Sequence, residues 1–458
     1  MSKTYDVIIV GSGTAGQTIA SKLAENHLKI ALVEQSNRPG GTCALRGCQA
    51  KKWFYEGAET IARTRHLAGT GIEKTAVASW LQLKNAKNEF TRQVPERTRK
   101  GLEKAGIDLF HGKATFQNDQ TLTVGSQALT ASWIVLATGA KPMPLPIDGA
   151  QHMIDSTAFL ELEKLPQRVI FIGGGFISFE FAHFAAQLGP AKSQITILEA
   201  GPRPLGPFDS EMVDLLLKAS GDEGINIHCE VDIASIESAD TAFRITLKDG
   251  AQFDTDLVVH GAGREPDIAD LNLARAGIDY EKQGILVNAQ MQTTNPRVFA
   301  VGDCVASVQL ARVADYEAQV AAANIRHLAT NHSLLSIVDY TVVPSLLFTY
   351  PQYGMVGATE DELIKKNVAY QKSFAKNLSW PTYQRLGMKN AGYKLLMGEN
   401  GLLLGAHILS DNASGLLNTL SLAMANTIPM ADLYHQSVLA PYPSRESDLH
   451  YMLKPFAS

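Results

Sequence analysis

"YDVIIVGSGTAGQTIASKLAENHLKIALVEQ", residues 5–35, predicts a strand, a turn, a helix and a second strand in that order. An apolar run at residues 7–10 leads into the turn, and a second apolar run at residues 30–33 ends at Glu34. Three glycines mark the turn and the start of the helix, namely Gly11, Gly13 and Gly16. The order of elements indicates one βαβ unit of a parallel α/β sheet.

This glycine spacing is typical of a dinucleotide site. The first glycine makes the tight turn, the second lets the backbone approach a pyrophosphate, and the third lets the helix pack closely on the strand. The phosphates would lie at the helix N-terminus, and Glu34 could accept hydrogen bonds from ribose hydroxyls. A glycine-rich turn without a ligand is the alternative, but the strands and the acid around the turn favour the nucleotide.

A second copy of the pattern stands at residues 168–200, "RVIFIGGGFISFEFAHFAAQLGPAKSQITILEA". Its turn contains Gly173 and Gly175, and its second strand ends at Glu199. Ser178 occupies the third glycine position, so we expect this helix to sit slightly further from its strand. Two dinucleotide sites in one chain predict hydride transfer between two nucleotides.

The segments between and after the copies fit this plan. Residues 133–146 read as a strand, a glycine turn and a proline-rich linker, and residues 257–266 repeat a strand followed by glycine. Residues 297–307 indicate a strand that ends at Gly302 and Asp303. The Asp303 carboxylate could accept a hydrogen bond from a polyol hydroxyl; an ordinary turn is the alternative. From about residue 336 short strands precede a helix, which predicts a separate α+β domain.

Composition limits the class of protein. The 458 residues suggest about three domains. With 45% apolar residues, a net charge of −5 and no basic block, nothing points to nucleic acid. We expect no signal peptide before the first strand and no membrane-spanning run, and therefore a cytoplasmic protein.

"GGTCALRGCQAKK", residues 40–52, places two of the four cysteines five positions apart. Such a pair can bind a metal, staple a loop or carry electrons. In a cytoplasmic protein, catalysis or metal binding is favoured over a structural disulfide. Because zinc takes about four ligands and no histidine is near in sequence, we expect no metal site. Cys229 and Cys304 are isolated, and each is interpreted as a small buried apolar residue.

These motifs together resemble the pyridine nucleotide-disulfide oxidoreductases, the family of dihydrolipoamide dehydrogenase, glutathione reductase and mercuric reductase. The redox motif GGTCxxxGCxPxK matches residues 40–52, with Ala50 in place of proline. Three further family motifs match elsewhere: Ala137, Thr138 and Gly139; Gly263, Arg264 and Pro266; Gly302 and Asp303. The resemblance covers essentially the whole chain.

The resemblance implies an α/β fold with two Rossmann-like dinucleotide-binding domains, for FAD and NAD(P), and a C-terminal α+β dimerisation domain. The expected boundaries are 1–147 and 266–335 for the FAD domain, 148–265 for the NAD(P) domain and 336–458 for dimerisation. It also implies a homodimer. The expected cofactor-binding residues are Gly11, Gly13, Gly16, Glu34, Gly41, Thr42, Ala137, Thr138, Gly139, Gly173, Gly175, Phe176, Glu199, Gly263, Arg264, Gly302 and Asp303.

For chemistry, the resemblance implies a redox disulfide between Cys43 and Cys48, with Cys48 facing the flavin and Cys43 exchanging with substrate. Lys52 and Glu180 match a pair beside the flavin, and Phe176 matches a residue that gates the nicotinamide pocket. A bridge across five residues needs a tightened turn, since an ideal helix separates them by roughly 8 to 9 Å. Gly40, Gly41 and Gly47 would allow that turn. Arg46 would favour a thiolate if it faced the sulfurs; a solvent-facing arginine is the alternative.

The sequence leaves the acceptor open. Dihydrolipoamide dehydrogenase-like activity on a small disulfide or lipoyl-type substrate is the leading hypothesis. A mercuric reductase-like enzyme, a glutathione reductase, and a flavin-bearing subunit or redox sensor without turnover are the alternatives. Glu199 predicts NADH over NADPH, although Arg203 could partly reverse this. The family's catalytic histidine motif, HPTxxE, is replaced here by Tyr442, Pro443 and Ser444, with Ser447 at the glutamate position. Tyr442 is therefore a candidate catalytic hydrogen-bond donor, or a residue that packs between subunits.

Overall fold

The structure, a computed structural model, describes residues 3–457 except 241, 331, 334 and 335. The chain divides into two compact units, and each unit is built from three stretches of sequence. The first comprises Met1–Trp53, Asn85–Pro144 and Gly263–Asp339, and the second comprises Phe54–Lys84, Leu145–Ala262 and Tyr340–Ser458. The boundaries of the four segments expected from the sequence stay a prediction.

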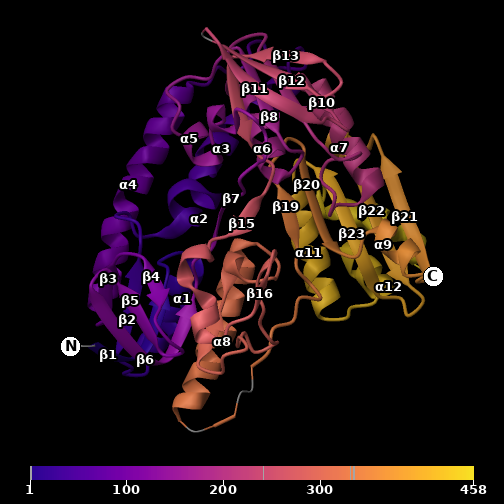
Figure 1. The fold of residues 1–458 in the computed structure, drawn as a ribbon. Helices are drawn as coiled ribbons and strands as arrows, with labels where there is room; N and C mark the ends of the chain where they lie inside the picture. Colours follow the sequence, from indigo (N-terminus) through magenta and orange to yellow (C-terminus); the bar gives the residue numbers. More distant parts are fainter. Residues whose placement is uncertain (1–2, 241, 331, 334–335, 458) are drawn as a thin grey trace. The chain divides into compact units, whose positions relative to one another are not determined.

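The first unit contains the sheet that the opening stretch predicts (Figure 1). Four parallel strands run in the order β3 (Asp108–His111), β2 (Ile30–Glu34), β1 (Lys3–Val10) and β6 (Gln127–Leu136), and β18 (Val298–Ala300) also pairs with β6 in parallel. The antiparallel strands β5 (Thr121–Val124) and β4 (Ala114–Phe116) extend the sheet beyond β6. Residues 7–10 of β1 are all buried, which explains their continuous apolar run.

Helices cover this sheet. In Figure 1, α1 (Thr14–Ala24) and α8 (Ala311–Ala329) lie side by side, and their buried residues join the core cluster of the sheet. The redox motif forms α2 (Gly41–Arg46) and the start of α3 (Cys48–His66), and α4 (Trp80–Lys104) follows. A short antiparallel pair is formed by β7 (Ala140–Pro142), which follows the Ala137–Gly139 motif, and β15 (Arg264–Pro266), which contains Arg264 and Pro266 of another family motif.

The second unit contains a second parallel sheet. Its order is β10 (Ile225–His228), β9 (Gln194–Leu198), β8 (Arg168–Ile172) and β14 (Leu257–His260). Helix α6 (Phe176–Leu188) follows β8, and α7 (Ser210–Asp222) precedes β10. Between β10 and β14 the chain forms a three-stranded antiparallel sheet of β11 (Ile233–Ala239), β12 (Ala242–Leu247) and β13 (Gln252–Thr255).

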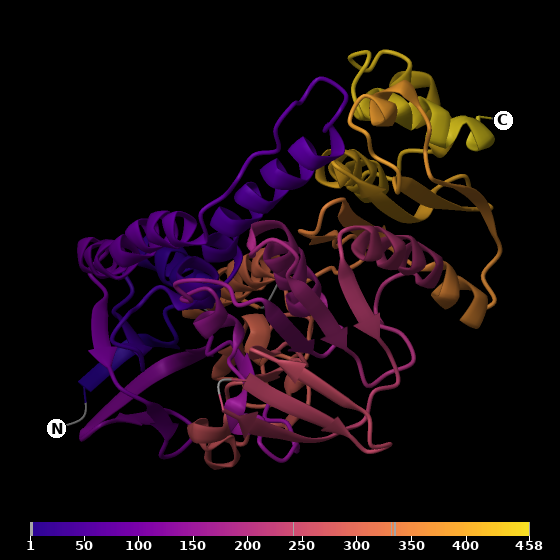
Figure 2. The ribbon, with the colours of Figure 1, turned by 90° about the horizontal axis from the view of Figure 1, so that it is seen from above.

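The C-terminal part of the second unit is the expected α+β segment. Five antiparallel strands run in the order β19 (Ser345–Leu347), β20 (Gln352–Gly357), β23 (Leu403–Ser410), β22 (Gly392–Gly398) and β21 (Tyr370–Lys376). Helix α11 (Ala413–Ala425) packs on β20 and β23, and α12 (Met430–Ser437) and α13 (Leu449–Leu453) follow, as the yellow end of the chain shows in Figure 2. The fold class predicted from the sequence is therefore confirmed. None of the helices in the described part of the chain is long and apolar enough to cross a membrane.

Candidate active site

The glycines of the first turn are fixed by close backbone packing. A Cβ atom on Gly11 would clash with the carbonyl oxygen of Ala137, and one on Gly16 would clash with the carbonyl oxygen of Gly11. Gly11 also has a φ of 109°, which disfavours other residues. The Ala137 to Gly139 motif thus lies directly against the fingerprint turn.

The two helices after the glycine turns begin without side-chain caps. Gly13 and Gly175 are the N-cap residues of α1 and α6, and neither helix has an acidic residue in its first turn. By contrast, the side chain of Asp209 caps α7 by accepting from the backbone N–H of Met212 at 3.1 Å. Uncapped N–H groups at a positive helix end suit phosphate oxygens, so both turns fit a dinucleotide.

The second turn keeps close packing despite the serine. Ser178 is fully buried, and a Cβ atom on Gly261, the residue after β14, would clash with its hydroxyl oxygen. The facing glycine therefore supplies the space that the third fingerprint glycine would have given. Glu199 lies at the end of β9, where its carboxylate accepts from the backbone N–H groups of Gly174 and Gly201. Phe176, the first residue of α6, is 45% exposed.

The redox motif places its cysteines on either side of a helix break. Cys43 lies on α2 and Cys48 is the first residue of α3. Gly47 between the helices has φ −129° and ψ −122°, and a Cβ there would come within 2.9 Å of the Thr42 carbonyl oxygen. This is the irregular turn that bridging across five residues requires. In the structure both cysteines are half-buried thiols.

The two thiols differ in acidity. A hydrogen bond from Cys43 holds the pKa of Cys48 down at about 6, against the effect of burial and with help from Lys51 and Lys52. The same hydrogen bond, together with burial, raises the pKa of Cys43. Arg46 is exposed, so the solvent-facing interpretation of that residue fits the structure. Cys48 is thus the thiol that ionises first.

The motif around Asp303 lies at the end of β18 in the same unit. Burial raises the pKa of Asp303, and Arg264 opposes that rise. Arg264 also donates to the carbonyl oxygen of Ala140, which joins β15 to β7. The neighbouring Gly302 N–H donates to the buried carboxylate of Glu317 on α8 at 2.6 Å. The Asp303 carboxylate at this position suits the hydroxyl groups of a polyol chain, such as the ribityl group of a flavin.

Lys52 and Glu180 belong to different units. Lys52 lies on the first turns of α3, and Glu180 is buried on α6, where it accepts from the backbone N–H of Phe348 at 3.1 Å. Their pairing beside a flavin stays a prediction.

Tyr442 is 76% exposed on a loop that is firmly anchored at its other end. Arg445 donates two hydrogen bonds to the Asp411 carboxylate, at 2.7 and 3.3 Å. The Ser447 hydroxyl donates to the carbonyl oxygen of Ser444 at 2.7 Å. The residue at the family's glutamate position is thus used to shape its own loop.

Two histidines, His435 and His450, are near Tyr442 in sequence. The ring of His450 stacks on Tyr434 with centroids 4.4 Å apart, and its Nδ1 lies 3.3 Å from the Ser437 hydroxyl. His435 is exposed on α12.

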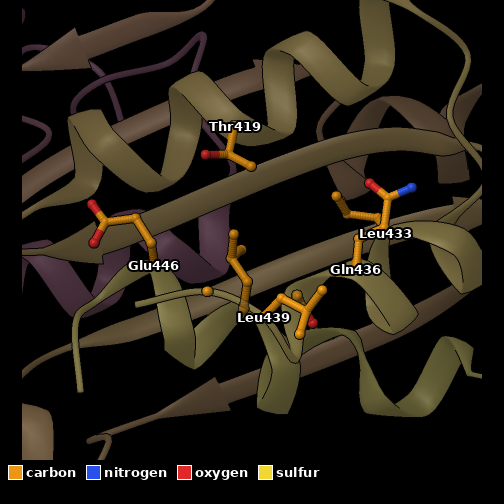
Figure 3. Close-up of a pocket in the computed structure, with 8 residues that line it drawn as sticks. Thr419, Leu433, Gln436, Leu439 and Glu446 are labelled. Carbon is orange, nitrogen blue, oxygen red and sulfur yellow. The ribbon is translucent and has the colours of Figure 1, made fainter. Parts of the chain in front are cut away.

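A pocket of about 290 Å³ lies beside the Tyr442 loop in the C-terminal segment (Figure 3). Its lining comes from α11, α12 and the residues around the loop: Thr419, Leu433, Gln436, Ser437, Leu439, Ala440, Glu446 and Leu449. Leu439, three residues before Tyr442, is 88% exposed and presents an apolar side chain to solvent. The pocket belongs to the second unit, whereas Cys43 and Cys48 belong to the first.

The structure corrects one sequence expectation and adds unpredicted residues. Cys304 is fully buried as expected, but Cys229 is only half-buried and the interpretation of it as a core residue was wrong. Ser12 was missed; a comparison of the middle residues of the two glycine turns would have found it. The ion-pair cluster of the buried Lys394 with Asp209, Glu211 and Glu360 was also missed, because these partners are distant from Lys394 in sequence. Among the described residues, no group of three or more His, Cys, Asp or Glu is placed to hold a metal ion.

Comparisons with known proteins agree with this geometry. The pyridine nucleotide-disulphide oxidoreductase family model matches residues 5–318, and the dimerisation-domain model of that family matches residues 343–450. A mercuric reductase of Staphylococcus aureus is 31% identical over 96% of this chain and 80% of its own length. A dihydrolipoyl dehydrogenase of Chlamydia pneumoniae is 28% identical over 95% of this chain and 93% of its own.

Solved structures give the same result. The HOCl-induced flavoprotein disulfide reductase RclA from Escherichia coli matches with a TM-score of 0.87 and 26% identity, over 98% of this chain and 99% of its own. Its Cu(II) complex matches equally well, with a TM-score of 0.87 and 26% identity over 99% of this chain and 100% of its own. The uncapped turn of α1, Glu34 and Asp303 fit the FAD of such enzymes, and the uncapped turn of α6 fits NAD(P). The chain belongs to the pyridine nucleotide-disulphide oxidoreductase family.

Proposed function

We propose that this chain is a homodimeric FAD enzyme that uses NADH to reduce a Cys43–Cys48 disulfide, and that the resulting dithiol reduces a thiophilic metal ion. Bound FAD would supply the two-electron relay between nicotinamide and sulfur. The residues of this chain hold the nucleotides, keep the two sulfurs together and lower the pKa of Cys48. Oxidation of the dithiol back to the disulfide releases two protons and two electrons, which reduce one Hg(II) to Hg(0) or two Cu(II) to two Cu(I).

Tyr442 is the observation that carries the choice of acceptor. Reduction of a disulfide substrate produces a thiolate that must be protonated, and oxidation of dihydrolipoamide needs a base for its thiol. A histidine with a pKa near 6.5 exchanges such protons at neutral pH, whereas tyrosine has a pKa near 10 and does so poorly. A soft metal ion binds thiolates directly and accepts electrons without any leaving group to protonate. The loss of histidine therefore affects a metal acceptor much less than a disulfide acceptor.

The similar proteins support this choice. One relative is a mercuric reductase, and RclA has been solved as a Cu(II) complex. Dihydrolipoamide dehydrogenase activity is the second candidate, since a dihydrolipoyl dehydrogenase matches over nearly its whole length and the cysteine pair would serve it as well. NADH is the proposed donor because the Glu199 carboxylate would repel a 2′-phosphate.

The test is a steady-state screen under anaerobic conditions, with NADH oxidation measured against Hg(II), Cu(II), lipoamide and glutathione disulfide. We expect a higher kcat/KM with one of the metal ions than with either disulfide. Cys43→Ser should abolish turnover. Cys229→Ser is the matched control. Cys229 is half-buried and lies outside the redox motif, so this substitution removes only adventitious metal binding. Faster turnover with lipoamide than with both metal ions would establish the second candidate instead.

A further inference from the structure

The two glycine turns have one hydrogen bond in common, from a backbone N–H to an acid, but only the first turn also forms hydrogen bonds through a side-chain hydroxyl. In each turn the middle residue donates its backbone N–H to the acid at the end of the next strand. Ser12 N donates to Glu34 Oε2 at 2.9 Å, and Gly174 N donates to Glu199 Oε2. The first turn has a hydroxyl at this position and the second has none. Only the first turn precedes a redox motif in the sequence.

The Ser12 hydroxyl joins two functional segments. It is fully buried, donates to Glu34 Oε2 at 2.5 Å and accepts from the backbone N–H of Gly40 at 3.0 Å. Glu34 is expected to bind the adenosine ribose, and Gly40 stands three residues before Cys43. A single side chain thus connects the nucleotide site to the start of the redox loop.

The backbones of the same two segments are in close contact. A Cβ atom on Gly41 would clash with the Cα atom of Gly13, and Gly40 and Gly41 both have positive φ values, 136° and 72°. The loop therefore enters its helix in one tight conformation. A buried Gly40 N–H also needs an acceptor, which Ser12 provides.

We propose that Ser12 is a positioning residue that holds the redox loop against the nucleotide turn and so favours the Cys43–Cys48 disulfide over the dithiol. The inference rests on the proposed function, because it requires that these cysteines form a redox pair. A restraint that keeps two thiols within bridging reach lowers the entropy cost of closing the bond. Ser12→Ala would remove the acceptor of Gly40 but leave the backbone bond from residue 12 to Glu34. The loop would be freed at its Gly40 end while the nucleotide turn kept its acid.

The experiment measures a thiol–disulfide equilibrium in the holoenzyme. Wild type, Ser12→Ala and Thr18→Ala are equilibrated anaerobically with mixtures of reduced and oxidised dithiothreitol, and the protein thiols are trapped by alkylation and counted by mass. The exchange is balanced: enzyme disulfide and dithiothreitol dithiol give enzyme dithiol and cyclic dithiothreitol disulfide. Thr18 lies on α1, the helix that follows the Ser12 turn, and is the matched control, since its hydroxyl donates at 2.7 Å to Asp315 on α8 and not to the redox loop. FAD content is recorded for every variant from its absorbance.

We expect Ser12→Ala to shift the equilibrium about fivefold toward the dithiol, the effect of losing one hydrogen bond. Thr18→Ala should leave it unchanged. Ser12→Gly, which reproduces the second turn, should shift it in the same direction and serves if the alanine variant fails to fold. An unchanged equilibrium in folded Ser12→Ala holoenzyme, with or without weaker FAD retention, overturns the inference. A wild-type protein that forms no Cys43–Cys48 disulfide overturns the proposed function itself and this inference with it.

Discussion

Glu199 and Arg203 lie four residues apart on one loop, yet each charged group binds the backbone of that loop. Glu199 Oε1 accepts from Gly201 N at 2.6 Å. Arg203 donates through its guanidinium group to the carbonyl oxygens of Phe208 at 2.9 Å and Gly206 at 3.1 Å. The guanidinium is therefore committed to shaping the loop, which leaves the Glu199 carboxylate as the charge expected to meet the ribose of a bound dinucleotide.

The first prediction is a preference for NADH. A 2′-phosphate brings nearly two negative charges toward Glu199, so we expect kcat/KM to be about tenfold higher with NADH than with NADPH. Arg203→Met should raise the KM for both nucleotides by a similar factor of about five, because it loosens the loop. Initial rates with each nucleotide at a fixed acceptor concentration measure both effects. A selective loss of NADPH turnover in Arg203→Met would show instead that Arg203 reads the phosphate.

The second prediction concerns the Cys48 thiolate. Two-electron reduction should give the yellow protein a long-wavelength absorbance band, from a thiolate next to oxidised flavin. Because the pKa of Cys48 is about 6, the band should be full at neutral pH and disappear as the pH falls through 6. Cys48→Ser should lack it. A Cys48→Ser protein that kept the full band would mean that another group makes it.

The hydrogen bond between the thiols gives a third prediction. Since Cys43 is the largest cause of the low pKa of Cys48, Cys43→Ala should move the pH midpoint of the band upward. The band itself should remain, because Cys48 is intact. A pH titration of absorbance measures the midpoint in the two-electron-reduced wild type and in unreduced Cys43→Ala, where Cys48 is already a free thiol beside oxidised flavin. Cys229→Ser, reduced like the wild type, is the control. An unshifted midpoint in Cys43→Ala would assign the low pKa to Lys51, Lys52 and the backbone hydrogen bond at Cys48.

The sequence predicts what depends on local pattern. Apolar runs and glycine spacing gave the strands, both dinucleotide turns and the break in the redox motif, because φ values and close backbone packing allow few residues there. It could not predict contacts between distant residues. The hydrogen bond between Gly40 and Ser12 spans 28 positions, and Gly261, which follows β14, compensates for Ser178 on α6. The same limit applies to Lys394, whose charge partners lie at the starts of two helices distant in sequence.

Lys394 gives a stability prediction. Its side chain, on β22, is 1% exposed, and its ammonium nitrogen lies 2.8 Å from Asp209, 3.0 Å from Glu211 and 2.7 Å from Glu360, which begins α9 (Glu360–Lys365). Lys394→Met would leave the fully buried Asp209 carboxylate without its cation. We expect the free energy of unfolding in urea to fall by about 3 to 5 kcal/mol at pH 7. Lys248→Met, which removes an exposed pair with Asp232, is the matched control and should cost less than about 1 kcal/mol.

The same cluster predicts a pH dependence. Burial alone would raise the pKa of Glu360, but hydrogen bonds from Lys394, Tyr370 and Lys372 bring it down to about 2. A carboxyl group with a lowered pKa stabilises the fold above its ordinary value of 4.5, and this contribution is lost as the pH falls toward 2. The difference in unfolding free energy between wild type and Lys394→Met should therefore narrow below pH 4.5. A difference that stayed constant down to pH 2 would remove Glu360 from the account.

The last prediction separates the two halves of the reaction. Tyr442 is exposed on an anchored loop, and its hydroxyl can donate a hydrogen bond to a thiolate or a bound acceptor. Tyr442→Phe should slow the reoxidation of the reduced enzyme by acceptor about tenfold, while reduction by NADH changes less than about twofold. Stopped-flow absorbance measures each half-reaction, with Tyr451→Phe, another exposed tyrosine of the tail, as the control. Equal rates for wild type and Tyr442→Phe in both halves would mean that Tyr442 serves only packing. Fast lipoamide turnover that falls below a pKa near 6.5 and disappears in His435→Ala would instead identify His435 as the base.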